Sequence, residues 1–424
     1  MADRGRRLLW AGARSAGRLL GRRLGRTPAA ATWAQIGEDW FQTLGQMKGA
    51  AMKLGQLVSQ YADVLPPELV APLARLQRAS QPRPFAEIEQ VLGEEWSAAH
   101  WAAVDAIEPS AMAAASIGQV HAARLADGRE VVIKVRYPGV AEAVDEDVDT
   151  LGRLLRMARL LPIDGIALDG LLAEIRARLR EETDYGCELR NLCDMRRAAA
   201  HPGVRYPEPV ELLCTPAVLV TTACPADDLA GAAAYPQAVR DRIGEILLRW
   251  FLQQVLVAGV VHADPHPGNF GFSPDGTLTV YDFGCVKHLP RHLQPLLRDG
   301  MRAGREHDWS GLHQMLYRIG ALEAAAADPV RRAQLREQLR PYYQAMTGAV
   351  IDPLRAQSMF DFSEPALIED ARAVLRADLS TLRHFRPVPE LAFVGRAASG
   401  LYWMLRALKA RVPVAACLDE AIGG

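Results

Sequence analysis

The sequence predicts an α+β fold of two lobes, preceded by a helical extension. Three observations predict it. Residues 113–135 combine an alanine-rich run and a β-branched run around an Asp127-Gly128 turn, which indicates a small sheet. Helical periodicity dominates the sequence on both sides of that sheet. A cluster of polar residues within 262–284 then indicates a site in the second lobe.

The predicted organisation has four parts. They are a basic segment at 1–31, a helical extension at 32–105, a first lobe with inserted helices at 106–225 and a helical second lobe at 226–424. Half of the 424 residues are hydrophobic, which permits a sizeable core in each lobe.

The composition argues against several classes of protein. The 49 basic and 50 acidic residues give a net charge of −1, so there is no global case for a nucleic-acid partner. The six cysteines form no C-x-x-C pair, which favours reduced thiols and a cytoplasmic location over a disulfide framework or zinc. No apolar run reaches the roughly 18 residues of a spanning helix, so we expect no transmembrane segment.

Charge is uneven at the start of the chain, where residues 1–26 carry eight arginines against the single acid Asp3. Leucines and a tryptophan interleave with these arginines. Three interpretations stay open: a basic amphipathic segment that lies peripherally on an anionic membrane such as the inner face of a bacterial membrane, a transit peptide, and a solvated arginine-rich tail. The presence of only one serine argues against the transit peptide.

The extension is predicted to contain one long amphipathic helix. Apolar residues recur every three to four positions from Thr32 to Tyr61. This helix carries Lys53, Gly55 and Gln56 within one turn, a trio that is ordinary surface chemistry when taken alone. Further helices are predicted at 68–78 and 85–92.

A strand, a loop and a second strand follow. The kinase glycine-loop pattern G-x-G-x-x-G-x-V fits residues 113–120 with alanine in place of the first two glycines. A Cβ restricts the approach of backbone amides to phosphate, so these alanines should alter how a nucleotide is held. Lys134, in the second strand, takes the place of the kinase strand lysine. The residues expected to line the loop are Ala113, Ala114, Ala115, Ser116, Gly118 and Val120.

Two helices are predicted at 140–161 and 168–200, and the second carries an acidic run. A kinase-like site needs one acid there to pair with Lys134, and Glu188 is the candidate. A solvated acidic helix is the alternative.

Strands are predicted next, at 210–213 and 217–222, with a connector between the lobes at 224–228. Backbone groups at Thr222 and Cys224 are expected to hydrogen-bond an adenine ring.

A core helix predicted at 239–257 leads into residues with phosphoryl-transfer spacing. Asp264 and Asn269 lie five apart, and Asp282 opens an Asp-Phe-Gly. In such a site Asp264 accepts the proton of the attacking hydroxyl, while Asn269 and Asp282 hold Mg²⁺ against the phosphates. A hairpin predicted over 270–281 brings Asn269 and Asp282 to the same end.

Two alternatives to this interpretation stay open. One is a solvated acidic loop. The other is a metal site formed by His262, Asp264 and His266, which alternate along the chain.

Beyond Gly284 the sequence contains neither an Ala-Pro-Glu nor a long activation segment. Protein kinases use that segment to bind protein substrates. Its absence favours a small molecule, a lipid or no phosphoacceptor over a protein. The remaining sequence is helical, and residues 394–414 are predicted to form a packing helix.

Together and in this order, these motifs resemble the UbiB/AarF/ADCK family of atypical kinases over roughly residues 40–410. The resemblance implies a protein-kinase-like bilobal fold in which the N-terminal helical extension packs over the active site and blocks protein substrates. It implies ATP and Mg²⁺ as cofactors. It also implies a link to coenzyme Q and other prenyl-lipid metabolism, with an isoprenoid or phenolic lipid as partner.

The resemblance assigns further residues to the catalytic set. Lys53 and Gln56 belong to a first signature, and Lys53 pairs with Glu182 of the Glu182-x-Asp184 signature. In the same way, Lys134 pairs with Glu188.

The sequence departs from the family pattern in two places. The connector at 221–225 lacks the usual glutamate and glycine, so the adenine contacts should differ. The chain also lacks the hydrophobic spanning helices at the end of some bacterial members, so any membrane contact would be peripheral.

The expected function is therefore an ATP- and magnesium-dependent kinase or ATPase in support of isoprenoid-quinone or lipid metabolism. Two rivals stay open. A small-molecule kinase of the antibiotic type shares the Asp264, Asn269 and Asp282 pattern but has no need of the Lys53 signature. A catalytically silent scaffold would bind nucleotide and regulate lipid-biosynthesis partners.

Overall fold

The structure is a computed structural model that describes residues 14, 18, 29–47, 82–115, 117–158, 165–322, 328–364, 366–377 and 381–423. The chain divides into two compact units. The first spans Met1–Leu189 and Glu208–Ala223, and the second spans Arg190–Pro207 and Cys224–Gly424. Both helices and strands build the units, so the predicted α+β class is confirmed. The predicted bounds of the four parts stay predictions.

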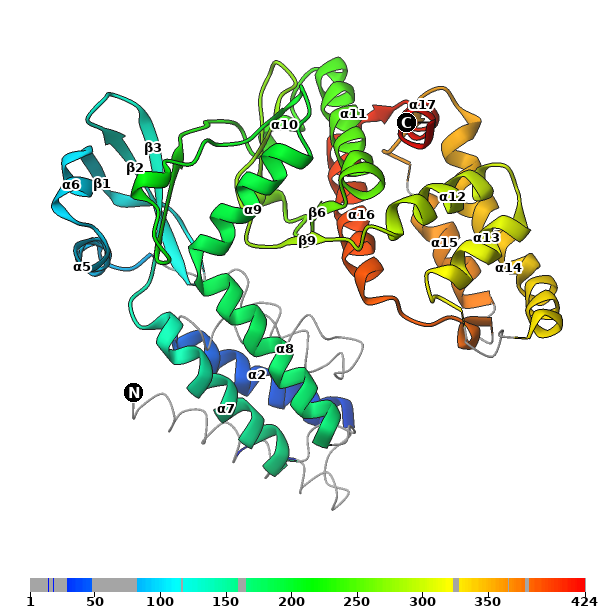
Figure 1. The fold of residues 1–424 in the computed structure, drawn as a ribbon, viewed down its shortest axis with the longest axis horizontal. Helices are drawn as coiled ribbons and strands as arrows, with labels where there is room; N and C mark the ends of the chain where they lie inside the picture. Colours follow the sequence, from blue (N-terminus) through cyan, green and yellow to red (C-terminus); the bar gives the residue numbers. More distant parts are fainter. Residues whose placement is uncertain are drawn as a thin grey trace. The chain divides into compact units, whose positions relative to one another are not determined.

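The first unit contains a four-stranded antiparallel sheet in the order β1-β2-β3-β5 (Figure 1). Its strands are β1 (Val104–Ala114), β2 (Gly118–Leu125), β3 (Glu130–Arg136) and β5 (Val218–Thr222). Val131, Ile133 and Val135 alternate into the core, so Lys134 faces the opposite side of β3. The predicted strand, loop and strand are confirmed.

Several helices share the core of this unit. They are α2 (Ala29–Met47), α5 (Phe85–Glu95), α7 (Val140–Ala158) and α8 (Gly165–Thr183), while the short helix α6 (Ala98–Ala102) buries no residue. Ile36, Ile88 and Val144 belong to the same buried cluster as the sheet residues, and α7 lies beside α8 (Figure 1). The rest of the helix predicted over 32–61, with Lys53 and Gln56, lies outside the described residues, as does the helix predicted at 68–78.

The single helix predicted over 168–200 is wrong, because the structure has two helices, α8 and α9 (Tyr185–Ala198). The break falls at Asp184, whose carboxylate accepts a hydrogen bond from the Gly186 backbone amide at 2.9 Å. A carboxylate in this position satisfies an amide that the start of a helix leaves without a partner. Helix α9 contributes its first turn to the first unit and its remainder to the second.

The strand predicted at 210–213 is also wrong. Residues Glu211–Leu213 form a 3₁₀ turn (η2), in which the Leu213 amide donates to the Val210 carbonyl at 2.8 Å. The turn buries Leu213 and leaves Leu212 68% exposed. The apolar run therefore does not form the buried face of a strand.

The second unit is centred on α11 (Gln237–Gln253), which continues into one π-helical turn, η3 (Gln254–Ala258). The segment that follows contains β6 (Val260–His262), η4 (Pro267–Asn269), β7 (Phe270–Phe272), β8 (Leu278–Val280) and β9 (Val286–His288). Strand β7 pairs antiparallel with β8, so the hairpin predicted over 270–281 is confirmed. Strand β9 pairs antiparallel with β6, and β4 (Val204–Arg205) pairs parallel with β8.

Helices make up most of the remainder. The elements are α10 (Leu229–Ala232), α12 (Leu293–Arg305), α13 (Trp309–Arg318), α14 (Pro329–Ala356), β10 (Phe360–Asp361), α15 (Ala366–Ala377), η6 (Thr381–His384), α16 (Pro389–Leu408), β11 (Arg411–Val412) and α17 (Val414–Gly423). Helix α16 lies beside α11 (Figure 1).

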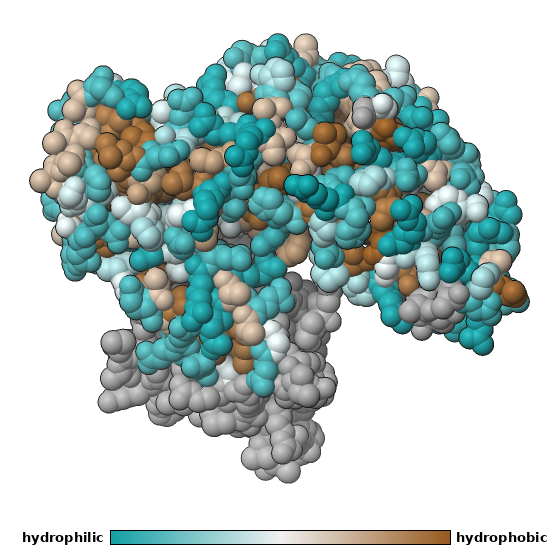
Figure 2. All heavy atoms as spheres, in the orientation of Figure 1, coloured by the Kyte–Doolittle hydropathy of each residue, from teal (hydrophilic) through white to brown (hydrophobic). Residues whose placement is uncertain are grey.

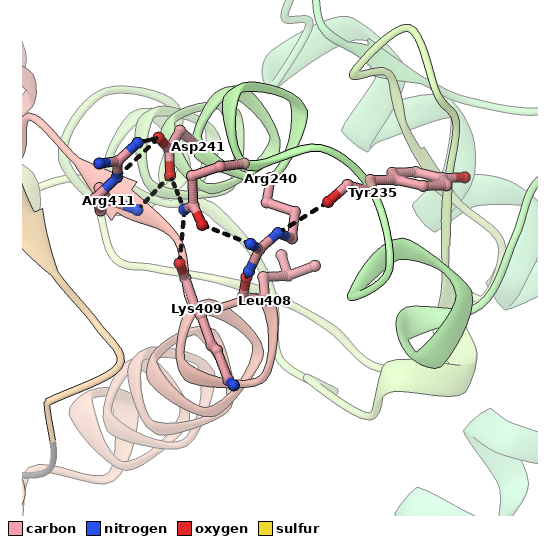
Figure 3. Close-up of polar contacts among 7 residues, drawn as sticks. Tyr235, Arg240, Asp241, Leu408, Lys409 and Arg411 are labelled. Carbon is pink, nitrogen blue, oxygen red and sulfur yellow. Dashed lines mark hydrogen bonds and ion pairs between the residues drawn. The ribbon is translucent and has the colours of Figure 1, made fainter.

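The helix predicted over 394–414 ends earlier, at Leu408, and Lys409 takes a left-handed conformation with φ 48°. Figure 3 shows side chains of α11 at this corner. Arg240 donates to the Leu408 carbonyl at 2.6 Å, and Asp241 accepts from the Arg411 amide at 2.7 Å. The first bond satisfies a carbonyl that the end of α16 leaves without a helical partner, and the second holds the start of β11 (Arg411–Val412) against α11.

None of the described helices is both long and apolar enough to cross a membrane. Figure 2 shows hydrophilic residues over most of the described surface on one face, with hydrophobic residues in small patches. Leu212, Met112 and Val330 have the largest exposed fractions among the big hydrophobic side chains, and they lie on separate elements. Scattered exposure of this kind is ordinary for a folded protein.

Candidate functional site

Lys134 and Glu188 form a shielded ion pair in the first unit. The Lys134 Nζ lies 2.8 Å from each Glu188 carboxylate oxygen. The lysine comes from β3 and the glutamate from the first turn of α9, and their side chains are 18% and 5% exposed. The Nζ also lies 5.2 Å from the centre of the Tyr185 ring. The predicted pairing of these two residues is present, while their catalytic role stays a prediction.

The alanine-rich segment includes the end of β1 and the start of β2. Ala113 and Ala114 lie within β1 and pair with Val120 and Gln119 of β2. The Ala115 amide donates to the Gly118 carbonyl at 2.8 Å, so this amide is already used within the segment. Ser116 lies outside the described residues.

Gly118 is required by packing. A Cβ built there would overlap the Tyr185 hydroxyl and lie 2.5 Å from the Val135 carbonyl oxygen. The glycine therefore allows β2 to approach both β3 and the start of α9 closely.

One backbone group of each residue expected to hold adenine is already hydrogen-bonded within the protein. Thr222, at the end of β5, accepts from the Glu208 amide through its hydroxyl at 2.9 Å, and its own amide donates to the Glu208 carbonyl at 2.8 Å. In the second unit, the Cys224 carbonyl accepts from the Tyr281 hydroxyl at 2.7 Å. Burial raises the pKa of Tyr281, so the hydroxyl stays a donor. The predicted roles of Thr222 and Cys224 stay predictions.

The acidic signature occupies the junction between α8 and α9. Glu182 is half-buried in the last turn of α8. Asp184 caps α9 and also accepts from the Cys187 thiol at 3.3 Å. The predicted partner of Glu182, Lys53, lies outside the described residues, as does Gln56.

Asp264 and Asn269 are held together in the second unit by the 3₁₀ turn η4. The Asn269 side-chain nitrogen donates to Asp264 Oδ2 at 2.8 Å and to the Asp264 carbonyl at 3.2 Å. The second carboxylate oxygen of Asp264 accepts from Arg396 Nη2 at 3.2 Å. Both oxygens of the predicted base are therefore fixed by a donor.

Asp282 is tied to the strand before Asp264 by a buried histidine. His262 Nε2 lies 2.7 Å from the Asp282 carbonyl, and the ring packs beside Phe270 and Phe283. Burial lowers the pKa of His262, so its ring is neutral at pH 7 and donates through Nε2. The Asp282 carboxylate accepts from the Gly284 amide at 2.9 Å.

The residues present fit Mg²⁺. Because the Asn269 side-chain nitrogen donates to Asp264, the amide oxygen of Asn269 is directed away from Asp264. Asp282 adds a carboxylate. Mg²⁺ is bound through one or two such protein oxygens together with substrate phosphates. By contrast, His262 turns to a backbone carbonyl and His266 accepts from the Gly268 amide at 3.1 Å. Within the described ranges no three His, Cys, Asp or Glu residues are grouped to hold a metal, so the alternative His/Asp site has no support.

Three residues that make contacts in this region were not predicted from the sequence. Asn191 donates to the Phe283 carbonyl at 2.8 Å. It lies one turn of α9 after Glu188, and this spacing could have indicated that the two residues share a helix face. Gln254 is buried and accepts from the His262 amide at 2.7 Å. A polar residue in the apolar stripe of a helix was its only signal. Arg396 is 132 residues from Asp264 and gave no local signal.

The chain is similar to several known proteins. Residues 75–316 match the ABC1 atypical kinase-like domain family. Over 381 residues the chain is 28% identical to the atypical kinase COQ8, mitochondrial, of Saccharomyces cerevisiae, covering 88% of this chain and 74% of that one. It is 29% identical over 389 residues to the atypical kinase COQ8B, mitochondrial, of Rattus norvegicus, covering 89% and 70%.

The match to the Caenorhabditis elegans atypical kinase coq-8, mitochondrial, is 26% identical and covers 50% of that protein, so the chain spans half of its length. Among solved structures, the complex of Mycobacterium tuberculosis Rv3197 with erythromycin is similar to this chain. The TM-score is 0.61 and the identity 27%, over 90% of this chain and 94% of that one.

Proposed function

The chain belongs to the ABC1 (UbiB/AarF/ADCK) family of atypical kinases, with the protein-kinase-like fold of that family, and from this membership we propose that it binds ATP with Mg²⁺ and transfers or releases the γ-phosphoryl group. The observation that carries the proposal is the hydrogen-bonded set of Asp264 and Asn269, with Asp282 tied to the same segment through His262. These are the residue types and the order that phosphoryl transfer needs.

Each group has a distinct task in the proposal. Asp282 and the amide oxygen of Asn269 would hold Mg²⁺, which would neutralise charge on the phosphates. Lys134, oriented by Glu188, contacts phosphate oxygens. Glu188 is nearly buried, so it holds the ammonium in one direction with two charge-assisted hydrogen bonds.

Asp264 acts as the proton acceptor. The oxygen of an acceptor hydroxyl attacks the γ-phosphorus, and the bond from that phosphorus to the β,γ-bridging oxygen breaks. The hydroxyl proton passes to Asp264, and ADP leaves with the bond's electron pair. With water in place of the hydroxyl, the same step is ATP hydrolysis.

The family and the sequence both support one class of acceptor. The absence of a long activation segment after Gly284 and the family link to coenzyme Q support a phenolic or isoprenoid lipid, or no acceptor, over a protein. The N-terminal extension with Lys53 and Gln56 would exclude protein substrates. The location we propose is cytoplasmic, at the surface of an anionic membrane, with the arginines of residues 1–26 as the contact. Arg18 is engaged in the protein itself, 3.0 Å from Asp39 of α2.

A second candidate function is binding or phosphorylation of an antibiotic-type small molecule. The observation in its favour is the similarity to Rv3197, whose structure was solved with erythromycin. Thermal-shift titration with erythromycin tests it: stabilisation that requires Mg·ATP supports phosphorylation, and no shift removes the candidate.

ATP turnover by the purified full chain tests the main proposal. ADP release is measured with and without anionic vesicles and quinone-precursor phenols, with Asp264→Asn as the matched control. We expect turnover that depends on Mg²⁺ and is lost in Asp264→Asn. Equal turnover in both proteins would contradict the role of Asp264, and no turnover under any condition would favour the scaffold.

A further inference from the structure

Helix α16 packs directly against the segment that carries the proposed base. Three of its residues, Phe393, Arg396 and Gly400, recur at the spacing of one helix face. A Cβ built on Gly400 would overlap the Pro265 side chain, so the helix backbone lies against the residue after Asp264. The Lys287 Nζ lies 5.6 Å from the centre of the Phe393 ring. Lys287 belongs to β9, which pairs with β6.

Arg396 is the charged residue on this face, and its Nη2 donates to Asp264 Oδ1 at 3.2 Å. The other oxygen of Asp264 accepts from Asn269. A carboxylate with one donor on each oxygen has its plane fixed, whereas with Asn269 alone it could rotate. Arg396 and Asp264 are 36% and 37% exposed, so the pair lies at the surface, where an acceptor could reach Asp264.

The kinase motif H-R-D-L-x-x-x-N has an arginine immediately before the catalytic aspartate. Here that position is Ala263, which is fully buried and carries no charge. The positive charge beside Asp264 comes instead from α16, which lies outside the residues matched to the family domain.

We propose that Arg396 is a positioning residue that sets the orientation of the Asp264 carboxylate, and that α16 is therefore part of the catalytic apparatus. This inference rests on the proposed phosphoryl-transfer function. Gly400 seats the helix against the loop, and Arg396, one turn earlier, contacts the base.

The test compares Arg396→Gln and Arg396→Lys with Arg406→Gln in the full chain. Arg406 lies on the same helix, but its guanidinium contacts the Trp403 ring, 5.5 Å from its centre, so it controls for the change in charge. We expect Arg396→Gln to lower kcat by about 100-fold, as for a small misplacement of a reacting group, with KM for ATP and the Mg·ATP thermal shift unchanged. Arg396→Lys should restore part of kcat, because an ammonium supplies one donor without the fork of arginine. Arg406→Gln should match wild type.

Amide hydrogen exchange of residues 262–269 gives a readout besides activity. We expect faster exchange in Arg396→Gln than in wild type and Arg406→Gln. A wild-type kcat in a folded Arg396→Gln variant would overturn the inference. A rise in KM as large as the fall in kcat would also overturn it. If wild type itself lacked turnover, the proposed function would fail; faster exchange confined to Arg396→Gln would still support positioning, and unchanged exchange would overturn it.

Discussion

Lys134 Nζ lies 2.8 Å from both carboxylate oxygens of Glu188, in surroundings that leave the glutamate side chain only 5% exposed. A shielded pair of this kind stabilises the fold weakly when intact, but breaking it leaves a charge without its partner.

We therefore expect Glu188→Leu to lower the free energy of unfolding by about 3 kcal/mol, because Lys134 would lose its counter-charge. Lys134→Met combined with Glu188→Leu should recover much of that loss, since both charges are then gone. Urea unfolding measures both, with Glu89→Leu, at an exposed position of α5, as the control. A double variant no more stable than Glu188→Leu would show that the pair is not the cause.

Gly118→Ala should lower the free energy of unfolding by about 1–3 kcal/mol, because the added methyl overlaps the Tyr185 hydroxyl and crowds the Val135 carbonyl. Gly170→Ala is the matched control, since a Cβ on this exposed residue of α8 meets nothing within 4 Å. It should instead raise stability by about 0.5–1 kcal/mol. Equal stabilities would refute the packing requirement at Gly118.

Asn191→Asp places a carboxylate oxygen against the Phe283 carbonyl where the amide now donates. We expect a loss of about 1–3 kcal/mol of stability and weaker Mg·ATP binding, because the Asp-Phe-Gly segment loses its tie to α9. Urea unfolding and thermal-shift titration measure the two effects. Arg197→Gln, on the exposed side of α9, should change neither. Wild-type behaviour of Asn191→Asp in both measurements would contradict this role.

The pH dependence of stability should report the buried His313. Burial lowers its pKa below the ordinary value of 6.5, with Arg336 and Arg332 adding to the effect, and its Nδ1 lies 2.9 Å from the Tyr343 hydroxyl. Below pH 6.5 the unfolded chain therefore binds a proton that the folded protein resists, so stability is full above that pH and falls as pH is lowered through it. His313→Leu should flatten this acidic decline in urea unfolding measured at several pH values. An unchanged dependence of stability on pH in His313→Leu would show that His313 does not cause the acidic decline.

The parts of the site that the sequence revealed are those with local spacing. Asp264 and Asn269 lie five residues apart in the sequence, and the strand that carries Lys134 shows plain alternation. The break at Asp184 was missed because helical periodicity continues across it, and only the cap contact separates α8 from α9. Arg396 could not be found, because its contact depends on how α16 packs, and no pattern in one sequence encodes that packing.

The most direct test of the account is nucleotide binding by Asp282→Asn, measured as the thermal shift produced by ATP with and without Mg²⁺. A neutral amide cannot supply the charge that offsets the metal at the phosphates, so the Mg²⁺-dependent part of the shift should vanish. Asp264→Asn, which changes the proposed base, should keep that shift while losing turnover. An Asp282→Asn variant stabilised by Mg·ATP as strongly as wild type would contradict the proposed kinase site.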